Sequence, residues 1–226
     1  MKRTVIFSSL TLILLSSIST SGKAQQLHMG LFADPVISWY SSNSEIISGG
    51  GARAGFSGGL AVNYYFAPNY AFSTGLNFTK TGGVQTSSEE TTFSFANYSQ
   101  VVTPGQKAIY SVSHLSIPAG LRLRTNQIGY LAIFSDIGFD AGVLTKGTIS
   151  IPSASIDNEH ASKEIPMLTL GFHIHAGTEY SLGGSTVLVI GIGYDRGLTD
   201  ITKDLSGQTL EKTTASAIRL KLGLFF

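Results

Sequence analysis

The sequence has no cysteine among its 226 residues, and only 13% of its residues are charged. The absence of cysteine excludes a disulfide framework, a cysteine-bearing metal site and a lipoprotein anchored through a lipid-modified cysteine. After the first apolar run, which is itself too short, no segment approaches the roughly 20 apolar residues that a membrane-spanning helix needs. If the chain is embedded in a membrane, it must therefore form a closed barrel, because only helices and closed barrels satisfy every backbone group in lipid.

The first 24 residues have the pattern of a secretory signal peptide. Lys2 and Arg3 precede an apolar run that extends from Val5 to Leu15, and a Ser/Thr-rich stretch follows. The segment ends in Gly22-Lys23-Ala24, with small residues at both positions that determine cleavage. We expect a signal peptide over residues 1–24 and a mature domain over residues 25–226, about the size of a single domain.

The charge of the mature chain gives no sign of nucleic-acid binding. The full sequence has 15 basic and 14 acidic residues, and its first 24 residues contain three of the basic ones and no acid. Cleavage leaves 12 basic and 14 acidic residues, a net charge of −2. A chain without a basic surplus lacks the electrostatic footprint of a nucleic-acid-binding protein.

The last nine residues, from Ile218 to Phe226, carry the clearest structural signal. On a β-strand, alternate residues point to opposite faces. One face then consists of Ile218, Leu220, Leu222, Leu224 and Phe226. The other face carries Arg219 and Lys221. A strand of this kind suits a barrel wall with lipid outside and a polar interior. The stretch also resembles the C-terminal signal that outer-membrane barrels present to their insertion machinery, which implies this role for Leu220, Leu222, Leu224 and Phe226.

The same period-two alternation extends over eight segments of the chain. These segments are Leu27–Ile37, Gly55–Phe66, Tyr70–Lys80, Ile109–Arg124, Ile128–Leu144, Ile165–Ser181, Thr186–Leu198 and Thr214–Phe226. Each has about ten residues or more, which is enough for a tilted strand to cross an outer membrane. The sequence therefore predicts an all-β fold, an eight-stranded antiparallel up-and-down transmembrane β-barrel whose first and last strands pair. Pro35 and Pro118 each remove a backbone donor inside such a strand, and we expect a bulge or a strand end at both.

Short and long connections alternate between the predicted strands. The tight turns lie at residues 67–69, 125–127 and 183–185, and the long polar connections at 40–54, 81–107, 145–164 and 199–213. Outer-membrane barrels place short turns in the periplasm and long loops outside. An even number of strands then puts both termini in the periplasm. We expect the protein in the bacterial outer membrane.

Several stretches resemble a known family. The first predicted strand, the segment Ser113-His-Leu-Ser-Ile-Pro-Ala-Gly-Leu-Arg-Leu123 and the glycine-rich C-terminal half are similar to the PorT-type outer-membrane β-barrel family of Bacteroidetes. The resemblance covers the mature chain and implies a barrel. A founding member is associated with protein secretion, so the resemblance also implies a secretion-accessory role. Its motifs carry no catalytic residues.

The predicted strands place many charged side chains inside the barrel. This lumen charge network comprises Asp34, Arg122, Arg124, Asp136, Asp140, His173, His175, Glu179, Asp195, Arg219 and Lys221. An eight-stranded barrel is only wide enough to be filled by side chains, and an unpaired charge in a narrow dry core is costly. We therefore favour an ion-paired plug, in which Arg219 pairs with Asp34 or Asp195. The alternative is a charge-selective conduit, basic toward the periplasm and acidic toward the outside.

The candidates for chemistry are weaker. His173, His175 and Glu179 share one strand face and, with His114, could bind a divalent metal. Glu179 lies about 13 Å along the strand from His175, so we favour histidines hydrogen-bonded to acids and expect no metal. Ser113-His114 and residues 157–160 fix no nucleophile, base and orienting acid at hydrogen-bond spacing. The glycines at 49–51 have no following helix or lysine to bind phosphate, and we expect no cofactor.

The loops carry the remaining functional signal. Residues 81–107 are rich in Ser, Thr and Gln and contain Phe93, Phe95 and Tyr98, which either extend the wall as a hairpin, contact a partner or pack on one another. We predict a non-enzymatic structural, adhesion, partner-binding or secretion-accessory barrel. Its partners would be outer-membrane lipid, the barrel assembly machinery and a surface or secretion partner bound through loops 81–107 and 145–164. A barrel that transports or binds a small solute, a lipid-modifying enzyme and a soluble barrel with inverted polarity remain alternatives.

Overall fold

The computed structural model describes residues 27–43, 47–94, 98–160, 165–201 and 213–226. The expected signal peptide over residues 1–24 lies outside this part of the chain. The strands are β1 (Leu27–Ser42), β2 (Ile47–Ala67), β3 (Tyr70–Ser87), β4 (Thr91–Ser94), β5 (Ser99–Val102), β6 (Lys107–Arg124), β7 (Leu131–Ile151), β8 (Ile156–His160), β9 (Leu168–Gly183), β10 (Thr186–Gly197) and β11 (Thr213–Phe225), with one 3-10 turn, η2 (Pro152–Ala154). The described residues contain no helix long and apolar enough to cross a membrane.

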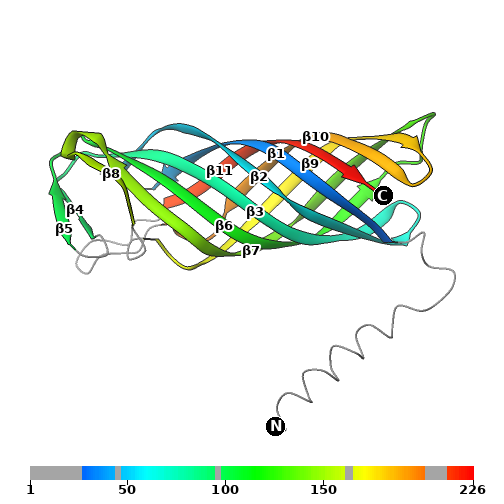
Figure 1. Ribbon diagram of the computed structural model, residues 1–226, viewed down its shortest axis with the longest axis horizontal. Helices are drawn as coiled ribbons and strands as arrows, with labels where there is room; N and C mark the ends of the chain where they lie inside the picture. The colour runs from blue at the N-terminus through cyan, green and yellow to red at the C-terminus, as the bar shows by residue number, and fades with distance from the viewer. Residues whose placement is uncertain (1–26, 44–46, 95–97, 161–164, 202–212) are drawn as a thin grey trace, which may run out of the picture.

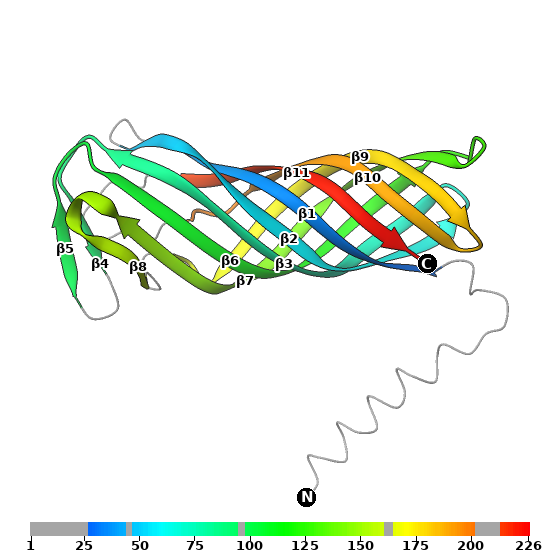
Figure 2. The ribbon, with the colours of Figure 1, turned by 45° about the horizontal axis from the view of Figure 1, so that its top comes forward.

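Eight antiparallel strands close into a ring, as the alternation predicts (Figure 1). The order around the wall is β1, β2, β3, β6, β7, β9, β10 and β11, and β11 returns to β1. β1 and β11 pair from Gly30 with Phe225 to Ser42 with Thr213, and Figure 2 shows them side by side. Beyond β11, the backbones of Met29 and Phe226 exchange two hydrogen bonds of 3.1 and 2.8 Å. Closure leaves these strands without an open edge, which lipid would not tolerate.

The two ends of the barrel differ. One end carries the N-terminal end of β1, the C-terminus and the short connections β2–β3, β6–β7 and β9–β10, and we call it the turn end (Figure 1). The opposite end, the loop end, carries the β4–β5 hairpin and β8, which pairs with β7. The β6–β7 turn is longer than expected because β7 begins at Leu131, while Ile128 forms only an isolated bridge to Leu131.

The wall extends farther at the loop end than the sequence predicts. The connections expected at 40–54, 81–107 and 145–164 are in large part strand, since β1 continues to Ser42, β3 to Ser87 and β7 to Ile151. Ile165, expected to open a strand, instead precedes β9 and is buried. The β4–β5 hairpin forms a separate two-stranded sheet and does not continue the wall.

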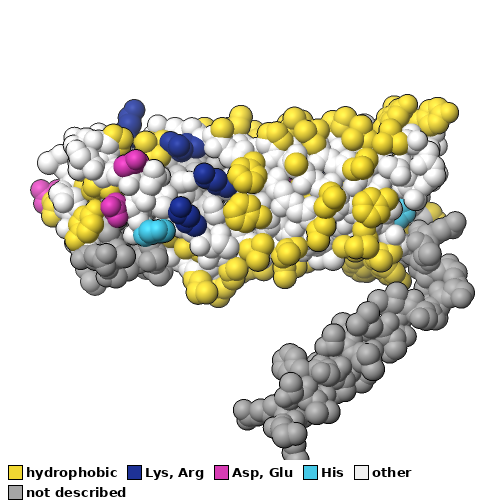
Figure 3. Space-filling model, viewed as in Figure 1, with side chains coloured by type: hydrophobic (Ala, Val, Ile, Leu, Met, Phe, Trp, Pro, Cys, Tyr) yellow, Lys and Arg dark blue, Asp and Glu magenta, His cyan; other side chains and the backbone are white. Residues whose placement is uncertain are grey.

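The polarity of the wall inverts between the two ends. Toward the turn end, large apolar side chains such as Leu31, Phe72 and Ile133 are exposed on the outside. Figure 3 shows a yellow band of hydrophobic side chains over this part of the face in view. Toward the loop end, the interior is apolar instead. There, buried residues form a cluster of Tyr40, Phe93, Val102, Ala108, Tyr110, Val112, Ile149, Ile151, Ile156 and Ile165, which we call the loop-end cluster. The outer face of the wall is polar at this end. The predicted strands therefore end too early, because they were identified by outward apolar residues.

Neither proline ends a strand or shifts its register. Pro35 pairs with Phe56 of β2, and Pro118 pairs with Asp140 of β7, in otherwise regular ladders. On the other edge of each strand, where β1 meets β11 and β6 meets β3, the pairing stops for a few residues and then resumes in the same register. Side chains occupy the gaps: Asp34 accepts a hydrogen bond from the Leu222 N–H at 2.9 Å, and Thr74 donates one to the Pro118 carbonyl at 2.8 Å. The expected bulge or strand end was therefore wrong at both positions.

Candidate functional site

The residues predicted to form the lumen charge network lie on the inward face of the wall. The side chains that are buried are Asp34, Arg122, Asp136, His173, His175, Glu179 and Arg219. The others, Arg124, Asp140, Asp195 and Lys221, are partly buried. Strand alternation places them inside, and two groups of contacts divide them, one nearer the turn end and one nearer the middle of the barrel.

The first group is built around Arg122 on β6. Its guanidinium binds Asp136 on β7 at 3.1 Å, and Nη2 and Nε bind one oxygen of Glu179 on β9 at 2.6 and 3.2 Å. Arg124 binds the second Glu179 oxygen at 2.5 Å. Two acids therefore neutralise two bases inside this group. Such charge-assisted bonds hold the geometry of three neighbouring strands.

Aromatic rings complete the environment of Arg122. Its guanidinium carbon lies 4.0 Å from the centroid of the Phe134 ring and 5.6 Å from that of Phe225. A guanidinium over a ring face gains a cation–π attraction. Phe134 is among the most deeply buried side chains and was not among the predicted site residues. Its alternation with Asp136 and Gly138 marks it as inward, and the search for charged groups alone overlooked it.

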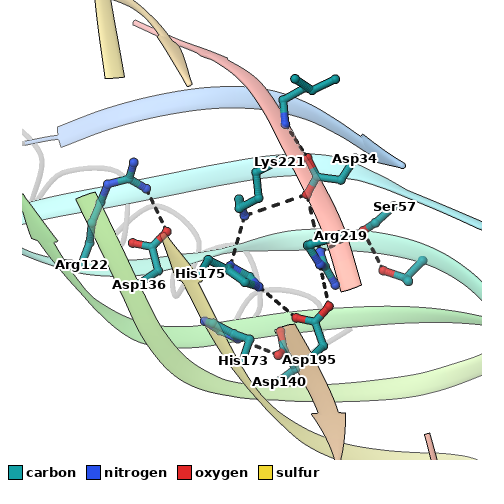
Figure 4. Close-up of polar contacts among 12 residues, drawn as sticks. Asp34, Ser57, Arg122, Asp136, Asp140, His173, His175, Asp195, Arg219 and Lys221 are labelled. Atoms are coloured by element: carbon teal, nitrogen blue, oxygen red, sulfur yellow. Dashed lines mark hydrogen bonds and ion pairs between the residues drawn. The ribbon is translucent and has the colours of Figure 1, made fainter. Parts of the chain in front are cut away.

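The second group joins β1, β7, β9, β10 and β11 (Figure 4). Arg219 Nε lies 2.6 Å from an Asp195 oxygen, and its Nη1 lies 3.6 Å from Asp34 and 3.4 Å from the Ser57 hydroxyl. The ion pair expected for Arg219 is thus present with both of the acids proposed for it. Lys221 lies 3.9 Å from the same Asp34 oxygen. Asp34 therefore stands between two cations while its other oxygen holds the backbone of β11.

The two histidines bridge the acids of this second group. His173 Nδ1 lies 2.7 Å from Asp140, and His175 Nε2 lies 2.9 Å from Asp195. Their rings stack with centroids 4.6 Å apart and planes 18° from parallel. Lys221 approaches His175 Nδ1 at 3.3 Å, so that nitrogen accepts the hydrogen bond. Both histidines are therefore held by acids on neighbouring strands.

The metal-binding alternative is not assembled by this geometry. Glu179, the third candidate ligand, is bound by Arg122 and Arg124 and does not contact the histidines. In the described part of the chain, no group of three or more His, Asp or Glu side chains is arranged to hold a metal ion. The expected layering of charge is present only in part: Arg122, Arg124 and Glu179 lie nearer the turn end, and Asp34, Asp140 and Asp195 lie nearer the middle of the barrel. Lys221, expected near the periplasmic end, lies with Asp34 and His175, and each group contains both signs of charge.

A glycine gives the second group its space. A Cβ on Gly193 would lie 2.3 Å from His175 Cδ2 and 2.8 Å from Arg219 Cγ. We expect Gly193→Ala to destabilise the folded barrel by about 1–3 kcal/mol through overpacking. Gly197→Ala on the same strand is the matched control, because its Cβ would meet its nearest atoms at 3.5 Å, an ordinary contact. The measurement is equilibrium unfolding in lipid vesicles. Equal stabilities of the two variants would contradict the close packing around Gly193.

The comparisons with known proteins agree with this architecture. The model of the outer membrane protein beta-barrel domain family matches residues 23–203. Among solved structures, Neisserial surface protein A (NspA) is similar with a TM-score of 0.50 and 12% identity, covering 87% of this chain and 95% of that one. Ail, the attachment invasion locus protein of Yersinia pestis, aligns with a TM-score of 0.43 and 15% identity over 89% and 99% of the two chains.

OprG from Pseudomonas aeruginosa aligns with a TM-score of 0.43 and 12% identity over 88% of this chain and 95% of that one. At 12% identity the similarity to NspA shows the fold and nothing more specific. No curated protein matches the sequence. The family match covers well over half of the chain. Together with the closed ring of eight strands, it shows that the chain belongs to the outer membrane protein beta-barrel domain family, the β-barrels of bacterial outer membranes.

Proposed function

We propose that this protein is a non-enzymatic outer-membrane barrel with a closed interior, whose loop end presents a surface to a partner. The observation that carries the proposal is that side chains fill the interior at two levels. Nearer the turn end, the guanidinium of Arg122 on β6 lies 5.6 Å from the centroid of the Phe225 ring on β11, the strand opposite β6 in the barrel, and the lumen charge network lies around this contact. Nearer the loop end, the loop-end cluster fills the interior with apolar side chains. An eight-stranded barrel has no width to spare around such a filling.

The connections support one orientation in the membrane. Outer-membrane barrels keep short turns in the periplasm and longer extensions outside. This rule supports a periplasmic turn end with both termini and an exposed loop end. The outward apolar face formed by Leu220, Leu222, Leu224 and Phe226 supports the proposed insertion signal and a role of the barrel assembly machinery in placing the chain in outer-membrane lipid.

The loop end offers a firmly anchored contact surface. Phe93 and Val102 of the β4–β5 hairpin are buried in the loop-end cluster, while Val101 is 50% exposed. Ile156 anchors β8 in the same cluster. The hairpin and β8 are therefore fixed on their inner side and accessible on their outer side, as a partner-binding surface within 81–107 and 145–164 requires. Phe95, one of the aromatics considered for this role, lies outside the described residues.

Two observations support a non-enzymatic role. Ser113 and His114 are neighbours on β6 and therefore point to opposite faces of the strand, so they cannot act as nucleophile and base. Asp157 belongs to the other stretch considered for catalysis, residues 157–160. It accepts hydrogen bonds from Ser150 at 3.2 Å and Asn158 at 2.9 Å, which give this acid a structural role. The finer assignment to the PorT-type family and to secretion rests on the segment Ser113–Leu123 and remains part of this proposal.

The decisive experiment is ion conductance. We expect the wild-type protein in planar bilayers to give no steady current, because side chains fill the barrel at both levels. Arg219→Ala should lower stability without opening a selective pore, since it leaves Asp195 less well paired but does not touch the loop-end cluster. A steady cation- or anion-selective current through the wild type, abolished or inverted by Arg219→Ala, would contradict a closed interior.

A barrel that binds a small solute is the second candidate, and one cavity favours it. A cavity of about 140 Å³ lies beside Arg219, lined by Ser38, His114, Asp140 and Asp195 among others. This volume has room for several water molecules or one small polar ligand. Solute flux into vesicles that is lost when His114 is replaced by a larger aromatic residue would favour this candidate over a closed structural barrel.

A further inference from the structure

Three cations lie on the outside of the wall where its polarity inverts. They are Arg53 on β2, Lys80 on β3 and Lys146 on β7, all exposed, and we call them the outer basic cluster. Lys80 pairs with Ser113 of β6, and Ser113 pairs with Lys146. Adjacent strands lie about 4.8 Å apart, so the Cα atoms of the two lysines are about 10 Å apart. Dark blue side chains gather at this level beside the yellow band in Figure 3.

A β-bulge carries Arg53 to this position. The register of β2 against β3 shifts between Ala52 and Phe56. Ser38 of β1 reaches across the gap, accepting from the Gly82 N–H at 2.9 Å and donating to its carbonyl at 2.7 Å. The Cδ of Arg53 lies 3.4 Å from where a Cβ on Gly82 would be, so the glycine gives room to the arginine side chain. A bulge of this kind re-aims a side chain.

The outer basic cluster borders the apolar band directly. Phe56 is the partner of Lys80 across the β2–β3 ladder, and Phe78 lies two residues before Lys80 on the same face of β3. The two rings are exposed, with centroids 5.9 Å apart. Leu115 continues this apolar surface on β6. The cations therefore lie at the edge of the lipid-facing surface, at the height of the headgroups.

The outer basic cluster forms no ion pair among the residues that the structure describes, whereas both lumen arginines nearest the turn end are paired. A concave site of about 170 Å³ beside Arg53 and Lys80 is also lined by Ser111, Ser150 and Asn158. It combines two cations with the hydroxyl group of Ser111, a donor that a phosphate group accepts from, while Ser150 and Asn158 donate to Asp157 at its border.

We propose that the outer basic cluster binds the phosphate of an anionic lipid headgroup in the adjoining leaflet, with the acyl chains lying against Phe56 and Phe78. With the loop end outside, this lipid is a phosphorylated glycolipid of the outer leaflet. A headgroup held at this point would fix the depth and rotation of the barrel in the membrane. The site is separate from the lumen, so it stands whether or not the interior conducts.

The test compares binding of diphosphoryl lipid A to protein in phosphatidylcholine nanodiscs. A basic residue near a membrane surface contributes about 1 kcal/mol to binding of anionic lipid, about fivefold in affinity. Replacing Arg53, Lys80 and Lys146 together by Gln should weaken binding about 100-fold. Lys107→Gln removes an exposed charge about 20 Å from Ser113 along β6, toward the loop end. This variant should change the affinity for lipid A less than twofold. All four side chains are exposed, and retained β-sheet circular dichroism shows that the variants fold.

Two further arms separate a lipid site from a site for free phosphate. Phe56→Ala with Phe78→Ala should weaken lipid A binding while leaving the weak binding of inorganic phosphate unchanged. Inorganic phosphate at millimolar concentration should displace lipid A only slightly. Equal losses for Lys107→Gln and for the triple variant would show a diffuse charge effect and overturn the proposal. So would unchanged lipid binding in the triple variant, or inorganic phosphate binding as tightly as lipid A.

Discussion

Replacing Arg122 by methionine is expected to destabilise the folded barrel by about 3–5 kcal/mol, the cost of leaving a buried charge without its partner. The acid most affected is Asp136. Its Oδ2 is bound by Arg122 at 3.1 Å, and its Oδ1 has no hydrogen-bond partner among the described residues. Glu179 would still be held by Arg124. The loss of the contact with the Phe134 ring adds to the effect.

Equilibrium unfolding in urea with lipid vesicles measures this loss, and the single tryptophan, Trp39, provides the fluorescence signal. Arg124→Met is the matched control. Its side chain is 23% exposed, and Glu179 keeps two contacts with Arg122 when it is removed. It should cost much less. Adding Asp136→Asn to Arg122→Met should restore a large part of the stability. A double variant as unstable as Arg122→Met alone would show that the lost packing, not the unpaired acid, dominates.

The contacts of the lumen charge network could be predicted where they follow from strand neighbours. Arg122 is directly opposite Asp136 on β7. Arg219 is opposite Gly193, which places Asp195, two residues away, diagonally beside it. Pairs directly or diagonally across two strands lie within reach of long side chains. Alternation and strand order were therefore enough to name Asp34 and Asp195 as partners of Arg219.

Other contacts depend on how far one strand is displaced along another, which alternation does not fix. Glu179 reaches Arg122 across the intervening β7, although its own ladder partner there is Ala132. Lys221 was assigned to the wrong level for the same reason, since its neighbour Asp34 follows from the offset between β1 and β11. A period-two pattern assigns each residue to the inner or outer face. The level of that residue along the barrel axis depends on the stagger between neighbouring strands.

The loop end was harder to predict because its pattern is the reverse of the lipid-facing wall. On β6, Leu115 and Leu121 face outward. Tyr110 and Val112, nearer the loop end of the same strand, are buried inside. A prediction that relies on outward apolar residues assigns the stretch around Tyr110 and Val112 to a loop. The reversal is itself informative, because it marks the height at which the surroundings of the wall change from lipid to water, and Lys80 and Arg53 lie at that height.

The second large effect is expected on the lipid-facing surface. Leu220→Arg should lower the stability of the inserted barrel by about 2–4 kcal/mol, the cost of an arginine facing lipid near the midplane. Leu220 is 48% exposed in the middle of the outward apolar face of β11, and it pairs with Ile192 on β10. Ile190→Arg, whose partner on β11 is Leu222, should cost a similar amount. Refolding titrations into lipid vesicles measure both.

Two control substitutions test whether the loss of stability depends on depth in the membrane. Leu224→Arg lies on the same face about 13 Å closer to the turn end, where the cost of an arginine falls toward the interface, so it should be smaller than that of Leu220→Arg. Val101→Arg introduces the same charge at a 50% exposed position on the β4–β5 hairpin, and its effect should stay within about 0.5 kcal/mol. A graded series in which Leu220 exceeds Leu224 and Leu224 exceeds Val101 follows from burial of the outward band in lipid. Equal small losses at all three positions would mean that water surrounds the band, and the inverted polarity of the loop end would then have no membrane surface to explain it.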